Sequence, residues 1–165
     1  MPATIEPMRE EDVEAVARLR VESFFKDSGR THAEDVADLR DMLRGDGFEC
    51  SMVARIGAEP VGSVLFVRHE LEPAHALTPW LAGLAVAKAF RGRGIGAALV
   101  RAVEAHARAV GAEPLYLYTW QARDFYAALG WQAVESLVQD GEPMFLMMRR
   151  LAPAAQDLPA FRIWS

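Results

Sequence analysis

A chain of 165 residues, of which 52% are hydrophobic and 25% charged, predicts one globular domain with a sizeable core and leaves little room for a second domain. The formal charge of −5 argues against a nucleic-acid partner, and no apolar run suffices for a membrane span, because Lys88, Arg91 and Arg93 interrupt the longest candidate. A single cysteine, Cys50, excludes an internal disulfide, and an amino terminus without the pattern of a signal peptide predicts a cytoplasmic protein.

The first part of the chain predicts a short strand followed by two helices. Residues 5–8 form a strand-like run, and the acidic residues 10–12 after it are typical of the first turn of a helix. A helical stripe then follows, made of Val13, Val16, Ala17, Arg20, Val21 and Phe24. Residues 31–34 have the form of a capping box, which predicts the start of a second helix that Gly45 ends.

The next elements are strands. Two runs rich in Val, Ile and Phe, residues 50–56 and 61–69, are joined by a turn with Gly57 and Pro60, so they predict an antiparallel hairpin. Residues 70–79 mix acids, a histidine and two prolines, which predicts a loop. This loop leads into a central strand that begins near Trp80.

The chain is organised around the turn at residues 91–96, which lies between that apolar strand and a helix predicted over residues 97–110. Its three glycines allow a backbone to approach a ligand closely, and the first turn of the helix leaves N–H groups without partners. The positive end of the helix dipole lies here, and Arg91 and Arg93 add two full charges. The pattern predicts a site for a phosphate group.

The last third of the chain predicts a strand, a short helix and a closing pair of strands. Residues 115–119 form a strand that makes a right-handed strand–helix–strand unit with the two elements before it. Residues 121–129 predict the short helix, and residues 131–138 and 144–150 predict the closing pair. The tail, residues 152–165, carries three large apolar side chains, so we expect it to dock on the domain or on a partner subunit in a homodimer.

Known phosphate-binding loops narrow the interpretation of the glycine turn. A nucleotide-hydrolysing P-loop needs Lys followed by Ser or Thr after its last glycine, whereas two alanines follow Gly96. A dinucleotide-binding fold stays open, because residues 92–97 satisfy the relaxed G-x-G-x-x-G/A form. That fold places an acid at the end of the next strand, where this sequence has Thr119.

A third kind of loop matches more of the chain. Arg91-x-x-Gly94-x-Gly96 after a strand resembles the acyl-CoA signature, (Gln or Arg)-x-x-Gly-x-(Gly or Ala), of the GNAT family of N-acetyltransferases. Residues 125–131 look like the family's second signature, a Tyr in a short helix followed by Gly and an aromatic residue, and residues 5–16 resemble its usual opening. The resemblance covers about residues 3–151.

The resemblance implies an α+β fold and an activity. The fold is a mixed, mostly antiparallel central sheet of six or seven strands, flanked by helices, with splayed central strands; it would occupy residues 1–151, followed by the tail. The implied activity is transfer of an acetyl group from acetyl-CoA, without a metal, to a primary amine that attacks directly in a ternary complex. The acceptor would be a small-molecule or peptide amine. A noncatalytic acyl-CoA-binding module is the alternative.

The family's functional positions can be transferred to this sequence one by one. The acetyl carbonyl would accept the backbone N–H of Leu84, and Tyr126 would act as general acid to the departing thiolate. The positions that match the family's acyl-CoA site are Leu84, Ala85, Val86, Arg91, Gly92, Arg93, Gly94, Gly96, Ala97 and Thr119.

The general base cannot be transferred in this way. Family members that acetylate histones have a Glu eleven residues before the first signature residue, where this sequence has Trp80. Glu70, Glu72 and His75, in the loop before that strand, are either the base or ordinary loop residues. Trp80 either lines the acceptor pocket or belongs to the core. An acyl-cysteine route is not expected, because no base or helix terminus is indicated beside Cys50.

Overall fold

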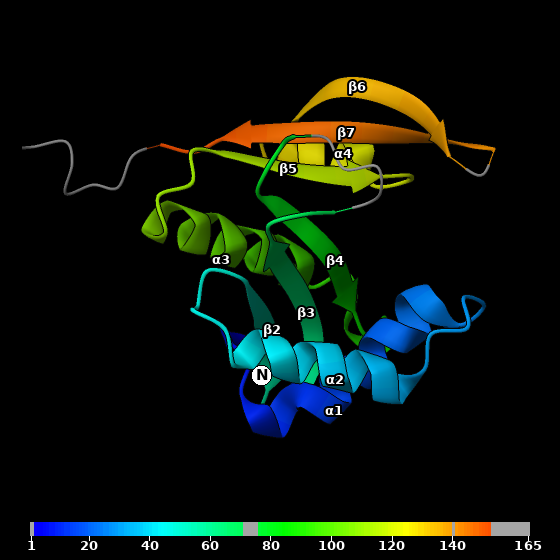
Figure 1. Cartoon of the computed structure of the whole chain (residues 1–165), viewed down its shortest axis with the longest axis vertical. Coiled ribbons are helices and arrows are strands. Elements are labelled where there is room, and N and C mark those ends of the chain that lie inside the picture. The colour runs from blue at the N-terminus through cyan, green and yellow to red at the C-terminus, as the bar shows by residue number, and fades with distance from the viewer. Residues whose placement is uncertain (1, 71–75, 140, 153–165) are drawn as a thin grey trace, which may run out of the picture.

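A computed structural model describes residues 2–70, 76–139 and 141–152, which form one seven-stranded sheet flanked by helices (Figure 1). The strands are β1 (Thr4–Pro7), β2 (Cys50–Ile56), β3 (Glu59–Val67), β4 (Trp80–Val86), β5 (Pro114–Thr119), β6 (Gln132–Gln139) and β7 (Glu142–Arg150). The helices are α1 (Val13–Arg20), α2 (His32–Leu43), α3 (Ile95–Ala109) and α4 (Arg123–Ala128), with two 3₁₀ turns, η1 (Glu10–Asp12) and η3 (Lys88–Phe90), and a π-helix, η2 (Val21–Phe25).

The strand order in the sheet is β1-β2-β3-β4-β5-β7-β6. Within the described ranges, β4 and β5 form the one parallel pair, and every other neighbouring pair is antiparallel. This topology confirms the predicted α+β class and the predicted hairpin. It differs from the parallel sheet of a dinucleotide-binding fold, so that alternative is not supported.

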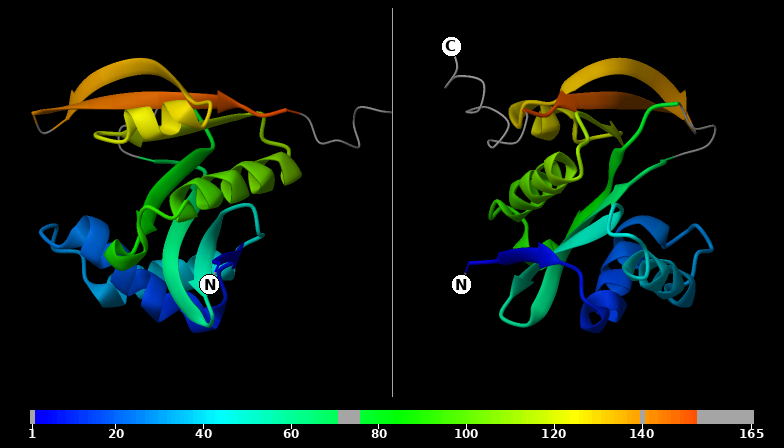
Figure 2. Two further views of the ribbon diagram at one scale, coloured as in Figure 1. Left: turned by 180° about the vertical axis from the view of Figure 1, so that it is seen from behind. Right: turned by 60° about the vertical axis from the view of Figure 1, so that its left-hand side comes forward.

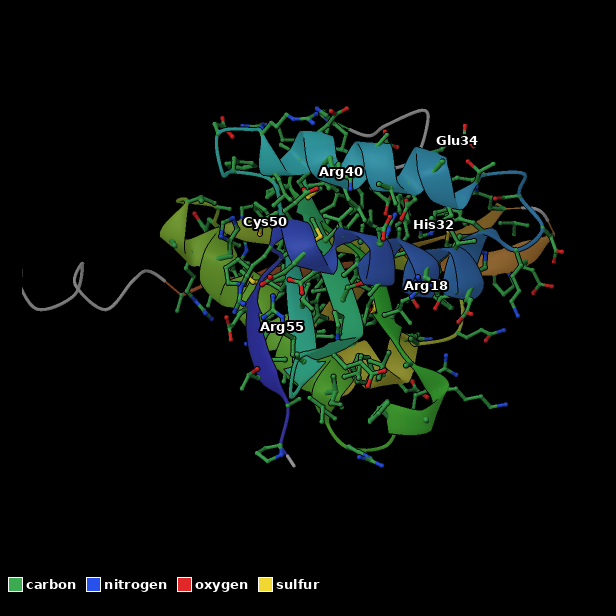
Figure 3. All side chains as sticks on the ribbon, turned by 90° about the horizontal axis from the view of Figure 1, so that it is seen from below. Arg18, His32, Glu34, Arg40, Cys50 and Arg55 are labelled. Carbon is green, nitrogen blue, oxygen red and sulfur yellow. The ribbon has the colours of Figure 1, made fainter. Side chains whose placement is uncertain are left out.

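Local chemistry fixes the helix ends. The predicted capping box of α2 is present, because Glu34 N–H donates to Thr31 Oγ1 at 3.1 Å and Thr31 N–H donates to Glu34 Oε1 at 2.8 Å; Figure 3 labels Glu34 near this end of α2. Helix α3 ends as predicted at Gly111, whose φ is +82°, and Ala112 N–H donates back to the carbonyl of Ala107 at 2.9 Å. No described helix has the length and apolarity needed to cross a membrane.

Two hydrophobic layers hold the sheet. Helix α3 covers one face of β2–β4, and α1 with α2 covers the other (Figure 2). On the first side, Leu99 and Val103 of α3 belong to a core that includes Leu81 of β4 and Leu115 of β5. This core therefore continues under both parts of the sheet, β1–β4 and β5–β7. The second core consists of Met8, Val13, Val16, Ala17, Val36, Leu39 and Val53.

Two predictions about helices need adjustment, and one about the tail is not tested. Helix α3 begins at Ile95, two residues earlier than expected, because Gly94 has φ of +82° and is itself the N-cap. Helix α1 does not continue regularly to Phe24: a π-helix follows it, and the Phe24 side chain is 44% exposed rather than on the buried stripe. The tail beyond Ala152, predicted to dock, lies outside the described residues.

Candidate active site

Strands β4 and β5 lie side by side at one end and then diverge. Their one register pair in the described residues is Trp80 with Tyr116, next to a hydrogen bond from Tyr116 N–H to the carbonyl of Pro79 at 3.1 Å. Beyond this point, no described strand pairs with the edge of β4 that faces β5. The splayed central strands expected from the resemblance are therefore present.

A β-bulge shapes the same part of β4. On the side of β3 the register shifts between Ser63 and Leu65, so that Gly83 and Leu84 together oppose a single residue of β3. Gly83 has φ of +62°, a conformation that suits glycine. The bulge occurs where the backbone of Leu84 was predicted to act.

A cavity of about 640 Å³ opens beside the gap. Its backbone wall is β4 from Leu81 to Leu84. Aromatic side chains from η2, from the end of β5 and from α4 line it, namely Phe24, Phe25, Tyr118, Trp120 and Tyr126. Among the described residues, the charged or titratable side chains that line it are those of Arg20, His69 and Glu70, together with the phenols of the two tyrosines. The cavity has the size and the mainly apolar lining of a small-molecule site.

Tyr126 lies on α4 at the wall of this cavity and is only 6% exposed. Its ring makes edge contacts with Phe125 and Trp131, with centroids 5.0 and 6.0 Å away. Burial raises the pKa of Tyr126 to about 12. Among the described residues, its hydroxyl has no hydrogen-bond partner. The phenol is therefore protonated at neutral pH and its proton is available to a ligand.

A buried carboxylate holds α4 in place. Glu104 of α3, 1% exposed, accepts hydrogen bonds from Arg101 Nη1 at 2.9 Å and from Trp131 Nε1 at 3.1 Å. Arg149 of β7 lies 3.3 Å from the same carboxylate. Both arginines also donate to the carbonyl of Leu129, each at 3.0 Å. This network ties the end of α4, and with it the ring packed on Tyr126, to α3 and to β7.

The glycine turn is exposed and leads directly into α3. Arg91 Nε donates to the carbonyl of Val86 at 2.9 Å, which ties the turn to the end of β4. The first helical bond runs from Ala98 N–H to the carbonyl of Gly94, so the N–H groups of residues 95–97 have no helical partner. No side chain caps this end and no acid lies in its first turn. It is therefore open to an anion.

The turn also adjoins the gap. A Cβ added to Gly96 would lie 3.5 Å from the ring of Phe125 and 3.9 Å from the side chain of Leu84. The open end of α3, the bulge of β4 and the helix that carries Tyr126 thus meet at one place.

The predicted site residues other than Trp80 fall into three groups. Leu84, Glu70, Thr119 and Tyr126 line the cavity, and the Thr119 hydroxyl accepts the N–H of Ala122 at 3.0 Å. Ala85 and Val86 continue β4 toward the turn, and Arg91, Gly92, Arg93, Gly94, Gly96 and Ala97 form the turn and the start of α3. Glu72 and His75 lie outside the described residues.

Trp80 lies behind Tyr118 and does not itself line the cavity. It is completely buried, its ring stacks on that of Tyr118 at 4.9 Å, and its Nε1 donates to the carbonyl of Leu77 at 2.9 Å. These contacts favour the core alternative for Trp80 over a role in the acceptor pocket.

Most residues that line the cavity were not predicted as site residues from the sequence, among them Arg20, Phe24 and His69. The signal for Arg20 was a charge on the otherwise apolar stripe of the first helix. His69 directly precedes Glu70 in the chain, so a titratable histidine lies next to this candidate base. Burial, then the negative charges of Glu135 and Glu70, raise the pKa of Tyr118.

Cys50 has no part in the cavity. Burial raises the pKa of its thiol to about 11, so very little thiolate is present at neutral pH. In the described part of the chain, no three His, Cys, Asp or Glu side chains come together as metal ligands.

Comparisons with known proteins agree with this arrangement. Residues 13–131 match the model of the acetyltransferase (GNAT) family. No protein of curated function matches the chain. Among solved structures, a GNAT-superfamily phosphinothricin acetyltransferase from Sinorhizobium meliloti, in complex with AcCoA, is similar with a TM-score of 0.76 at 16% identity, over 96% of this chain and 97% of that one.

Two further structures are similar. Ard1 from Thermoplasma volcanium has a TM-score of 0.71 at 21% identity, over 92% of this chain and 99% of that one. An aminoglycoside 6′-N-acetyltransferase complexed with coenzyme A has a TM-score of 0.73 at 18% identity, over 92% of this chain and 98% of that one. At these identities the likeness shows the fold.

Proposed function

The chain belongs to the GNAT family of acetyltransferases, whose model matches residues 13–131, and on that premise we propose that it transfers an acetyl group from acetyl-CoA to a primary amine. One observation carries the proposal. The unpaired edge of β4, the protonated phenol of Tyr126 and the open end of α3 meet beside one cavity. Two of the similar structures contain AcCoA or coenzyme A, which supports the choice of donor.

The residues present fit this donor. The N–H groups of residues 95–97 are free for a pyrophosphate, and the glycines of the turn leave open space beside them. Residues 91–94, with Gly96 and Ala97, would bind the phosphates. Residues 84–86 would pair through their backbone with the pantetheine arm, because the edge of β4 facing β5 has no partner there. Thr119 would contact the same arm through its hydroxyl.

Two groups of the chain act on the reacting atoms in this proposal. Acetyl-CoA supplies the acetyl group as a thioester. The N–H of Leu84, held in the bulge, would donate to the acetyl carbonyl, which favours attack by an amine because negative charge develops on that oxygen. The Tyr126 hydroxyl would donate its proton to the departing sulfur, and a pKa of about 12 keeps that proton in place at working pH.

The amine must lose a proton before or during attack. Glu70 lines the cavity and is our candidate base, acting directly or through water, with His69 beside it. Transfer would be direct, in a ternary complex, because Cys50 lies away from the cavity and its thiol has a pKa of about 11. The cytoplasmic location and the homodimer remain predictions.

Two measurements test the proposal. In calorimetry we expect heats of binding with acetyl-CoA and CoA and none with NAD; binding of NAD alone would contradict the choice of donor. In a thiol-release assay over a panel of amines, we expect release above the rate without acceptor. Binding of acetyl-CoA without release for any amine would favour the noncatalytic module.

A further inference from the structure

The cavity wall contains a charged group that the transfer chemistry does not use. Arg20, the last residue of α1, is 8% exposed and lines the cavity between Phe24 and the bulge of β4. Its Nε and Nη2 donate to the carboxylate of Asp35 at 2.9 and 3.3 Å. Its third nitrogen, Nη1, points at Gly83, where an added Cβ would lie only 2.7 Å away.

The Nη1 group of Arg20 has no hydrogen bond to any residue that the structure describes. Nη1 is not sealed in the core either. The fully buried side-chain atoms that lack a hydrogen bond in the described ranges are Ser51 Oγ, Arg55 Nη1, Ser63 Oγ and Arg149 Nε. Since Arg20 Nη1 also lacks a hydrogen bond but is not one of these atoms, part of its surface is accessible. Two N–H donors on a nearly buried guanidinium are therefore reachable from the cavity. A guanidinium presents such donors in a planar fork that matches a carboxylate.

The ion pairs around Arg20 leave one of its nitrogens to a ligand. Asp35, completely buried, is shared by Arg20 and Arg30, whose Nη2 lies 3.0 Å from Asp35 Oδ1. The other acid bound to Arg30 is Asp38, whose side chain is 66% exposed. The two guanidinium groups and the two carboxylates balance in formal charge, but Asp38 binds only Arg30, so the free Nη1 of Arg20 keeps its N–H donors for a further anion.

The position of this group fixes the kind of acceptor. Gly83, beside which Nη1 lies, directly precedes Leu84, whose N–H is proposed to hold the acetyl carbonyl, and consecutive Cα atoms are about 3.8 Å apart. An anion bound at Arg20 is thus a short distance from the reacting carbon. The amine and the anionic group of the acceptor must be separated by few bonds, as in an α-amino acid.

We propose that the acceptor is a free α-amino acid with an apolar or aromatic side chain, whose carboxylate binds to Arg20. This inference rests on the proposed function. The apolar side chain would pack against the exposed rings of Phe24 and Trp120, which are 44% and 43% exposed beside the cavity. An acceptor with several ammonium groups is disfavoured, because it would bring positive charge to Arg20.

The first experiment uses the unmodified protein with matched acceptors. Thiol release from acetyl-CoA is followed with phenylalanine, tryptophan, leucine and methionine, with their amides, and with phenethylamine, which lacks the carboxylate. We expect kcat/KM for the best amino acid to exceed that for its amide by about tenfold or more, the size of a charge-assisted hydrogen bond. Amides or phenethylamine that react as fast as the amino acids overturn the inference, and so does a panel in which no amino acid reacts.

The second experiment assigns the effect to Arg20. In Arg20→Met we expect KM for the amino acid to rise about tenfold or more, with values for the amides and for acetyl-CoA within about twofold of the original. Arg18→Met is the matched control, an exposed arginine on α1 in the helical layer nearest the viewer in Figure 3. An equal loss for amino acids and amides in Arg20→Met contradicts the proposal.

Failure of this inference differs from failure of the proposed function. Acetylation of the amides and of phenethylamine, without preference for a carboxylate, removes the inference and leaves the acetyltransferase. No heat of binding with acetyl-CoA and no thiol release with any acceptor removes both. If Arg20→Met does not fold, shown by loss of a cooperative thermal transition, Arg20→Lys keeps the charge without the fork, and we expect it to show the same preferential loss for the amino acids.

Discussion

Gly94 and Gly111 form a matched pair for testing the anion site at the start of α3. Both have φ of +82°, and at both positions an added Cβ would meet no heavy atom within 4 Å. They lie at opposite ends of the same helix. Replacing either by alanine therefore adds about 1–2 kcal/mol of backbone strain without causing a clash. In a domain of this size, each substitution should lower the unfolding midpoint by about 2–8 °C.

The two substitutions should differ in their effect on the donor. The open space at Gly94 lies beside the free N–H groups of residues 95–97, so the new methyl group takes room that a phosphate needs. We expect Gly94→Ala to weaken acetyl-CoA binding about tenfold, which is about 1.4 kcal/mol. Gly111→Ala, with the same strain, should keep the affinity within about twofold. For each variant, calorimetry gives the affinity for acetyl-CoA and thermal denaturation gives the unfolding midpoint.

The comparison has clear refuting outcomes. If both variants lose affinity for acetyl-CoA to the same extent, the loss reflects general destabilisation and does not support phosphate binding at the turn. If Gly94→Ala keeps full affinity, the turn at residues 91–96 is not where the phosphates bind.

Three further substitutions test the assigned roles. Tyr126→Phe should lower kcat about a hundredfold at unchanged affinity for acetyl-CoA, because it removes a general acid whose hydroxyl has no partner in the described structure; an unchanged kcat would remove Tyr126 as the acid. Cys50→Ala should keep full turnover, since the thiol has a pKa of about 11 and lies outside the cavity; loss of turnover would reopen an acyl-cysteine route. Glu104→Gln should destabilise the protein by about 2 kcal/mol, which is less than the cost of breaking a fully buried ion pair, because Arg101 is half exposed. The midpoint of thermal denaturation should fall by about 4–8 °C. An unchanged midpoint would show that the network does not stabilise the fold.

Tyr126 also gives a pH dependence with a definite sign. Its pKa is raised from 10 to about 12 in the folded state, so between these values the unfolded chain loses the phenolic proton first. Stability should therefore fall as pH rises through this window and be unaffected by this group below it. Comparing denaturant midpoints of the original protein and Tyr126→Phe from pH 9 to 11 isolates the contribution; parallel pH profiles would contradict it.

Elements fixed by local chemistry were predictable from the sequence. The strand at Cys50–Ile56 was predicted with the observed bounds, and the capping box at Thr31 is present, because both depend on residues close together in the chain. The glycine turn before α3 was identified for the same reason. The start of α3 was misplaced by two residues, since the sequence does not reveal that Gly94 adopts the left-handed conformation of an N-cap.

The acceptor side of the site depends on contacts between distant segments and was mostly missed. Arg20 reaches the cavity only because Asp35, fifteen residues later, holds its guanidinium, and Phe24 faces the cavity because a π-helix interrupts the regular turn. The support of Tyr126 through Glu104 and Trp131 likewise joins residues 27 positions apart. No periodicity or motif in the sequence records such pairings.

The divergence of β4 and β5 makes the donor part of what holds the protein together. The two parts of the sheet share a core under α3, but between β4 and β5 they have one register pair. A ligand that occupies the gap completes the sheet, and at a hundred times its Kd it adds about 2.7 kcal/mol to the free energy of unfolding. On binding of the donor, amide hydrogen exchange should slow most along β4 and β5. The cellular concentration of the donor would then set how often these two strands separate.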